Sequence, residues 1–209
     1  MTLSRKFDAV IFDMDGVLID AKEWHYKALN SALELFGLHI SKEDHLARFD
    51  GLPTRTKLNT LSVEHNLPKE LHPLINEVKQ ERTMRLAAQY CYPKPNLLTI
   101  FSYLKSENYK IGLATNSIRQ TTEAMMKYAG LLDYFDVIVT NEDVISPKPA
   151  PQIYLNACEK LNVEPSNVLV FEDNHHGIQA AKDAGCYVSV VKEPDLLFLD
   201  DVLRELEVL

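Results

Sequence analysis

The residues in this sequence best suited to chemistry are two pairs of carboxylates, each placed where a short apolar run ends. Asp13 and Asp15 follow the run 9–12, and Glu172 and Asp173 follow the run 168–171. Like charges held this close together are costly unless a cation neutralises them. The pairs therefore indicate a cation site, although Asp-x-Asp-Gly also makes a good turn and an acidic pair can simply cap a helix.

Two further polar segments follow other apolar runs. Thr115-Asn116-Ser117 offers hydroxyls and backbone amides ahead of an expected helix, which is an anion-binding arrangement or an ordinary helix cap. Lys148 lies among prolines that stiffen the backbone around it, although a lone loop lysine is usually solvated. Each feature has a structural alternative, but all four together at successive run ends favour a single site.

Five short runs rich in β-branched and apolar residues predict buried strands. They are almost continuously apolar rather than alternating, which is typical of a parallel sheet covered on both faces. Helical stretches separate the later runs, so the pattern predicts an α/β sheet with right-handed crossovers. The expected strands are 9–12, 111–114, 137–139, 168–171 and 187–191, and the expected helices are 95–106, 119–129, 151–161 and 177–184.

One interval, from about residue 21 to 92, contains no strand-like run. Its apolar residues recur with helical periodicity, and Gly51-Leu52-Pro53 and Asn66-Leu67-Pro68 punctuate it. We therefore predict an inserted helical cap domain at 21–92 and an α/β core formed by 1–20 and 93–209. Pro93-Lys94-Pro95 marks the expected return to the core.

Composition narrows the class of protein. The 209 residues carry a formal charge of −8, which argues against nucleic acid as a partner over the surface as a whole, while a local cationic pocket could still bind phosphate. Three dispersed cysteines without a CxxC spacing predict reduced thiols rather than a metal centre. We see no signal peptide and no membrane span, and expect a cytoplasmic monomer or weak homo-oligomer.

The four polar segments resemble the four motifs of the haloacid dehalogenase superfamily. The resemblance extends from Phe7 to about Val191, and the insertion point of the helical block is similar to that of helical-cap members, especially β-phosphoglucomutase-like and sugar-phosphatase-like ones. It implies a Rossmann-like core, with the first strand central between the second and fourth, and Mg²⁺ as cofactor. Dehalogenase activity is not expected, because dehalogenase members lack the metal-binding acid pair.

The resemblance also suggests a role for each core residue. Asp13 is the expected nucleophile; Mg²⁺ would be held by Asp13, Asp173 and the backbone carbonyl of Asp15. The side chain of Asp15 would protonate the leaving oxygen and then deprotonate the acceptor, and Glu172 would support the metal through water or a hydrogen bond. The residues expected to hold the phosphoryl group are Thr115, Asn116, Ser117 and Lys148.

In the cap, three residues are substrate-binding candidates. His25 matches a histidine of many mutases and phosphatases, but a solvated or core-edge histidine fits equally. Arg55 lies in what resembles a substrate-specificity loop, where the mutases carry their arginine one residue earlier, at the position of Thr54. Lys79 resembles a cap lysine that reaches the active site, yet we favour its interpretation, with Arg82, as a solvated helix face.

The leading functional hypothesis is Mg²⁺-dependent hydrolysis of a small phosphorylated metabolite, a sugar or polyol phosphate, through an aspartyl phosphate. The alternative is a β-phosphoglucomutase-type phosphomutase. Ala21 stands where family members commonly carry Thr or Ser, and the loss of that hydroxyl counts against a mutase. A catalytically idle scaffold is disfavoured, because Asp13, Asp15 and Asp173 are all present.

Overall fold

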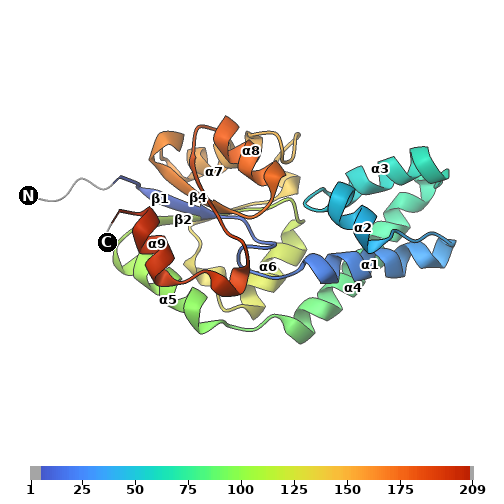
Figure 1. Cartoon of the computed structure of the whole chain (residues 1–209), viewed down its shortest axis with the longest axis horizontal. Coiled ribbons are helices and arrows are strands. Elements are labelled where there is room, and N and C mark those ends of the chain that lie inside the picture. The colour runs from blue at the N-terminus through green and yellow to red at the C-terminus, as the bar shows by residue number, and fades with distance from the viewer. Residues whose placement is uncertain (1–5, 208–209) are drawn as a thin grey trace, which may run out of the picture. The chain divides into compact units, whose positions relative to one another are not determined.

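The computed structural model describes residues 6–207, which divide into two compact units. One unit contains residues 6–20 and 92–207 and is built around a parallel β-sheet. The other contains residues 21–91 and is helical. Figure 1 labels the elements of both units.

The sheet has five parallel strands in the order β3-β2-β1-β4-β5. In the central strand, Val10 pairs with Ile111 on one side and Leu169 on the other. The predicted α/β class is therefore confirmed, including the central place of the first strand. The strands are β1 (Ala9–Phe12), β2 (Lys110–Ala114), β3 (Val137–Val139), β4 (Val168–Glu172) and β5 (Tyr187–Val190).

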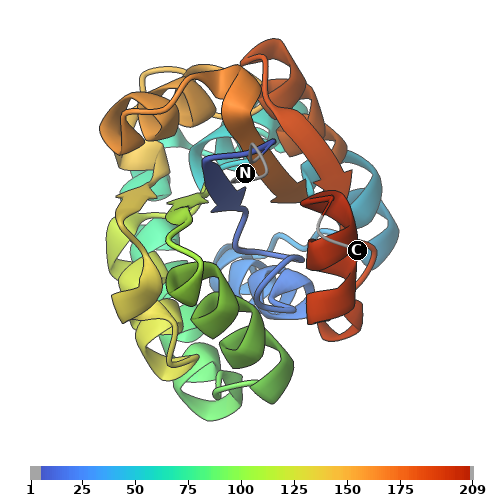
Figure 2. The same ribbon diagram turned by 90° about the vertical axis from the view of Figure 1, so that its left-hand side faces the viewer.

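Helices cover both faces of this sheet, as Figures 1 and 2 show. Helices α5 and α6 lie on one face, with α9 beside α5, and α7 and α8 lie on the other. This division follows from right-handed crossovers, because the chain reverses its direction across the sheet after β3. The helices are α5 (Pro95–Ser106), α6 (Arg119–Tyr128), α7 (Gln152–Leu161), α8 (His175–Asp183) and α9 (Leu199–Glu205).

Alternate residues of β1 pack against different layers, which explains why the run is apolar throughout. Ala9 and Ile11 belong to a buried cluster with residues of α7 and α8. Phe12 stacks on Phe171 at 5.2 Å between ring centroids and lies 4.9 Å from the ring of Phe101 in α5. The core thus holds the strands rigidly, and the carboxyl ends of adjacent parallel strands open at one edge.

The helical unit has its own hydrophobic core. Buried Leu29, Leu33, Leu58 and Ile75 join helices that would otherwise expose their apolar stripes. None of the helices within residues 6–207 combines the length and the hydropathy that a membrane crossing requires. The unit's main helices are α1 (Lys22–Leu33), α2 (Lys42–Asp44), α3 (Thr54–His65) and α4 (His72–Tyr90), with a π-helical turn at His45–Phe49.

Candidate active site

Asp13 is the first residue beyond β1, and its backbone is held by the neighbouring strand. Its amide donates to the carbonyl of Phe171 at 3.0 Å, so the residue continues the ladder of a buried sheet. The residue is buried, with 7% of its surface exposed. Burial raises the pKa of the Asp13 carboxyl well above its ordinary value; the Lys148 ammonium opposes that rise, whereas Glu172 and Asp173 add to it.

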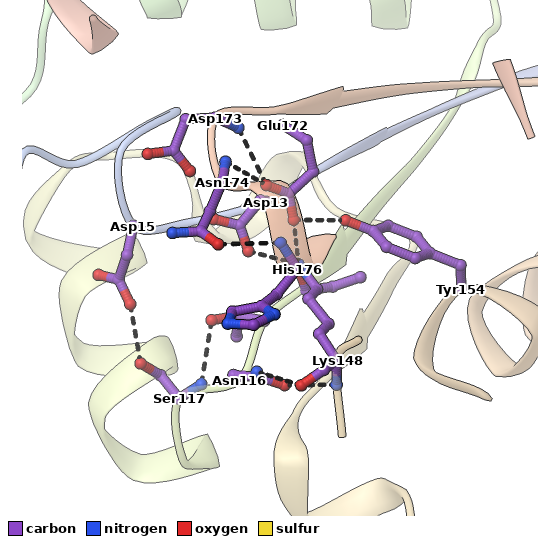
Figure 3. A network of polar contacts seen from close by, with 12 residues as sticks. Asp13, Asp15, Asn116, Ser117, Lys148, Tyr154, Glu172, Asp173, Asn174 and His176 are labelled. Atoms are coloured by element: carbon purple, nitrogen blue, oxygen red, sulfur yellow. Dashed lines mark hydrogen bonds and ion pairs between the residues drawn. The ribbon is translucent and has the colours of Figure 1, made fainter. Parts of the chain in front are cut away.

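Lys148 is the cation of the site, and three acceptors fix its ammonium. Nζ donates to Asp13 Oδ1 at 2.6 Å, to Glu172 Oε1 at 2.6 Å and to the carbonyl of Ala114 at 2.9 Å. Burial by itself lowers the pKa of an ammonium, but Asp13 and Glu172 together raise the pKa of Lys148 above its ordinary value. The residue is therefore a fixed positive charge aimed at the Asp13 carboxylate, as Figure 3 shows.

Glu172 receives four hydrogen bonds from the protein. Oε1 accepts from Lys148 Nζ and, at 2.8 Å, from the hydroxyl of Tyr154. Oε2 accepts from the backbone amides of Asp173 at 2.9 Å and Asn174 at 3.1 Å. With each oxygen already bound by two donors, Glu172 is better placed to orient Lys148 and the Asp173 segment than to bind a cation directly.

The acidic residues here fit a divalent cation. Single carboxylate oxygens of Asp13, Glu172 and Asp173 lie within 4.8 Å of one another, and oxygen donors are what Mg²⁺ prefers. Of these three carboxylates, Asp13 and Glu172 share the ammonium of Lys148, so further positive charge is needed to keep all three ionised.

A glycine lets the two acidic segments approach each other. Gly16 has φ +91°, and a Cβ placed on it would lie 2.0 Å from Asp173 Oδ2. Only a residue without a side chain can both adopt this backbone conformation and leave room for the carboxylate. Gly16 thus forms one wall of the space occupied by Asp173.

The segment after β2 contributes hydrogen bonds to both neighbouring loops. Ser117 Oγ donates to Asp15 Oδ2 at 2.9 Å, and the Ser117 amide donates to Thr115 Oγ1 at 3.1 Å. The Asn116 side chain accepts from the amide of Lys148 at 3.1 Å. The eight core residues expected at the site, Asp173 included, are therefore joined by direct contacts or lie on adjacent strand ends.

The three candidates of the helical unit lie on different helices. His25 is half-buried on α1 and Arg55 is exposed on α3. Lys79, on α4, is only 8% exposed, so its interpretation as part of a solvated helix face is wrong, whereas Arg82 is exposed as expected. Lys57, which the sequence analysis overlooked, is also buried, at 7% exposure.

Two core residues were also missed from sequence. Tyr154 donates to Glu172, and Asn174 caps α8 by accepting the amide of His176 at 3.0 Å. A signal for Tyr154 did exist, because it lies in the first turn of the helix that follows Lys148. Without the packing, however, a tyrosine in a predicted helix reads as ordinary core.

Comparison with known proteins gives concordant similarities. The family described as haloacid dehalogenase-like hydrolase matches residues 10–191. A phosphorylated carbohydrates phosphatase of Thermotoga maritima is 34% identical over 178 residues, covering 85% of this chain and 82% of the relative. Fructose-1-phosphate phosphatase YqaB of Escherichia coli is 31% identical over 180 residues, covering 86% and 94% of the two chains.

Among solved structures, the β-phosphoglucomutase of Clostridium difficile is similar throughout. The match has a TM-score of 0.84 and covers 96% of this chain and 97% of the other. At 24% sequence identity, this likeness concerns the fold.

Proposed function

Because the chain belongs to the haloacid dehalogenase-like hydrolase family, we propose that it hydrolyses small phosphorylated metabolites, with sugar or polyol phosphates as the substrate class. The chain is a phosphatase of this family, and the two phosphatase relatives named above act on phosphorylated carbohydrates. In this proposal Asp13 is the nucleophile that accepts the phosphoryl group and becomes an aspartyl phosphate.

The observation that carries this proposal is the buried contact between Lys148 Nζ and Asp13 Oδ1, at 2.6 Å. A carboxylate can attack the phosphorus of a dianionic ester only if positive charge offsets the repulsion. Lys148 supplies one such charge and cannot turn away, because Glu172 and the Ala114 carbonyl hold it.

Asp13 and Asp173 would hold Mg²⁺, with the backbone carbonyl of Asp15, and Glu172 would support them from behind. When bound, the ion supplies Lewis acidity and further charge neutralisation at the phosphoryl oxygens. Because the pKa of Asp13 is raised, its carboxyl group needs added positive charge to stay ionised, and a bound cation would supply that charge.

Asp15 is the proton carrier in this proposal. As Asp13 forms its bond to phosphorus, the bond to the leaving oxygen breaks and Asp15 gives that oxygen its proton. Asp15 then takes a proton from water, which attacks phosphorus and releases phosphate from Asp13. The Ser117 hydroxyl, 2.9 Å from Asp15 Oδ2, orients the carboxylate for both steps, while Thr115 and the Asn116 amide bind phosphoryl oxygens.

Hydrolysis is preferred to phosphomutase chemistry because of Ala21. This residue begins α1 without a side-chain hydrogen bond, where a hydroxyl would be expected to help control the general acid of a mutase. The candidates for substrate recognition in the helical unit remain Arg55, which is exposed, and Lys79, which is buried. His25 remains a candidate.

The test is phosphate release from a panel of sugar, polyol and nucleotide phosphates and pyrophosphate, with Mg²⁺ and with a chelator. We expect sugar or polyol phosphates to be turned over fastest, chelation to stop release, and Asp13→Asn to lose at least about a thousandfold in kcat with an unchanged circular dichroism spectrum. Substantial turnover by Asp13→Asn, or release indifferent to chelation, would contradict the mechanism. Conversion of a hexose 1-phosphate to its 6-phosphate, without free phosphate, would instead indicate the mutase.

A further inference from the structure

Tyr154 is a fully buried residue whose hydroxyl points into the acidic site rather than to water. It is the third residue of α7, and its ring packs in the buried cluster beneath the sheet with Ile153 and Cys158. Packing alone would be satisfied by phenylalanine. The hydroxyl therefore needs its own explanation, and its contact is with Glu172 Oε1 at 2.8 Å.

Tyr154 affects the position of Lys148 in two ways. Glu172 Oε1, which accepts from Tyr154, is the same oxygen that accepts from Lys148 Nζ at 2.6 Å. In addition, Nζ lies 4.8 Å from the centroid of the Tyr154 ring, within the range of a cation–π interaction. Tyr154 thus bounds the position of the ammonium directly, through its ring, and indirectly, through Glu172.

Lys148 is shared between two carboxylates, at 2.6 Å from each. Glu172 and Asp13 compete for the Lys148 ammonium. A larger negative charge on Glu172 Oε1 attracts the ammonium more strongly and weakens its interaction with Asp13. A hydroxyl donated to that oxygen disperses part of its charge. More of the ammonium's field is then available to Asp13 and the group bound to it.

We propose that Tyr154 is a positioning residue for phosphoryl transfer, which acts through Glu172 to aim Lys148 at Asp13. It does not touch the substrate. This inference rests on the proposed function, because it presumes that Asp13 receives the phosphoryl group.

The test is Tyr154→Phe, which removes only the hydroxyl, assayed with Mg²⁺ and the best substrate of the panel. We expect kcat to fall about tenfold, the size of one hydrogen bond to a charged group, with KM changed less than about twofold, because the loss concerns charge at the reacting centre. Tyr134→Phe is the matched control. It removes a tyrosine hydroxyl that contacts Ser102 Oγ at 3.1 Å and should leave kcat unchanged.

A double-mutant cycle separates positioning from general support of the fold. In a Glu172→Gln background, Tyr154→Phe should cost almost nothing further in kcat, because the negative charge that the Tyr154 hydroxyl disperses is already gone. Should Glu172→Gln fail to fold, Lys148→Arg provides the second background, in which the tenfold factor should likewise shrink.

Wild-type kcat in Tyr154→Phe, or the same tenfold loss in both backgrounds, would overturn the proposal while leaving the Asp13 mechanism intact. If Asp13→Asn kept its activity, the proposed function would fail first, and the role of Tyr154 with it.

Discussion

Lys148 uses its ammonium entirely within the protein, on two carboxylates and a backbone carbonyl. Such an arrangement is costly to build, because charges must leave water. At the scale of the residue, the proposed function gives this costly arrangement a chemical reason. The same group that keeps Asp13 and Glu172 from repelling each other would neutralise a phosphoryl group bound at Asp13.

Replacing Lys148 by Met should therefore damage both activity and stability. We expect kcat to fall at least about a hundredfold and the free energy of unfolding to drop by about 3–5 kcal/mol, because two buried carboxylates lose their partner. Phosphate-release kinetics and urea unfolding measure the two effects. Lys160→Met is the control: the exposed Lys160 has its Nζ 3.7 Å from Asp143 Oδ1, and its loss should cost less than about 1 kcal/mol. Equal effects of the two substitutions would contradict the role of Lys148.

At the scale of the element, strand β4 and helix α8 are joined so tightly that the site depends on the first turn of the helix. Only Asp173 and Asn174 separate Glu172 at the end of β4 from His175. Gly177 then passes so close to Glu172 that an added Cβ would lie 1.6 Å from Oε1. The carboxylate cannot easily yield, because four donors hold it.

Gly177→Ala tests this packing against helix propensity. Propensity alone would favour alanine by about 1 kcal/mol, but the clash with Glu172 should reverse the sign and cost about 1–3 kcal/mol, with a fall in kcat as Lys148 loses its partner. Gln179→Ala, exposed on the same helix, should change stability by less than about 0.5 kcal/mol. A more stable, fully active Gly177→Ala enzyme would show that the carboxylate moves freely.

At the scale of the whole molecule, each of the two units has a core of its own. The core of the helical unit contains a buried ionisable group that the proposed chemistry does not use. His45 is 2% exposed, and neither ring nitrogen has a hydrogen-bond partner among residues 6–207. Burial, and then the charge of Lys57, lower its pKa from 6.5 to about 4.

This shift predicts how stability depends on pH. In the folded chain His45 stays neutral down to about pH 4, whereas in the unfolded chain it takes up a proton below about pH 6.5. Its contribution to stability is therefore complete above pH 6.5 and is lost as the pH falls towards 4. Between about pH 7 and pH 5 we expect a loss of roughly 1–2 kcal/mol from this group.

Comparison of His45→Phe with wild type isolates that loss. Thermal unfolding at the two pH values should show a smaller decrease for His45→Phe. The same change at His65, which is exposed, should leave the wild-type pH dependence in place. An equal decrease in wild type and His45→Phe would mean that His45 is not held neutral.

The sequence by itself determined the sheet and the family. Strands covered on both faces must be apolar at every position, so buried strands can be recognised from sequence, and all five strands agree with prediction within one residue. The prediction that the fifth strand is buried is wrong: β5 lies at the edge of the sheet, and its Tyr187 and Val190 are exposed. The polar residues at the strand ends were found for a related reason, since they interrupt those runs. Helix α9 was missed because its seven residues are too few to display a helical period.

Only the tertiary structure decided how those polar residues are connected. Lys148 and Asp13 are 135 positions apart. Tyr154 and Glu172 meet only because α7 packs against the sheet beside the end of β4. The burial of Lys57 and Lys79 could not be predicted either, because helical periodicity does not show whether a lysine side chain lies against a neighbouring element or in solvent. Apolar burial is a property of each run, whereas a hydrogen bond depends on the distance between two atoms, and that distance exists only once the chain has folded.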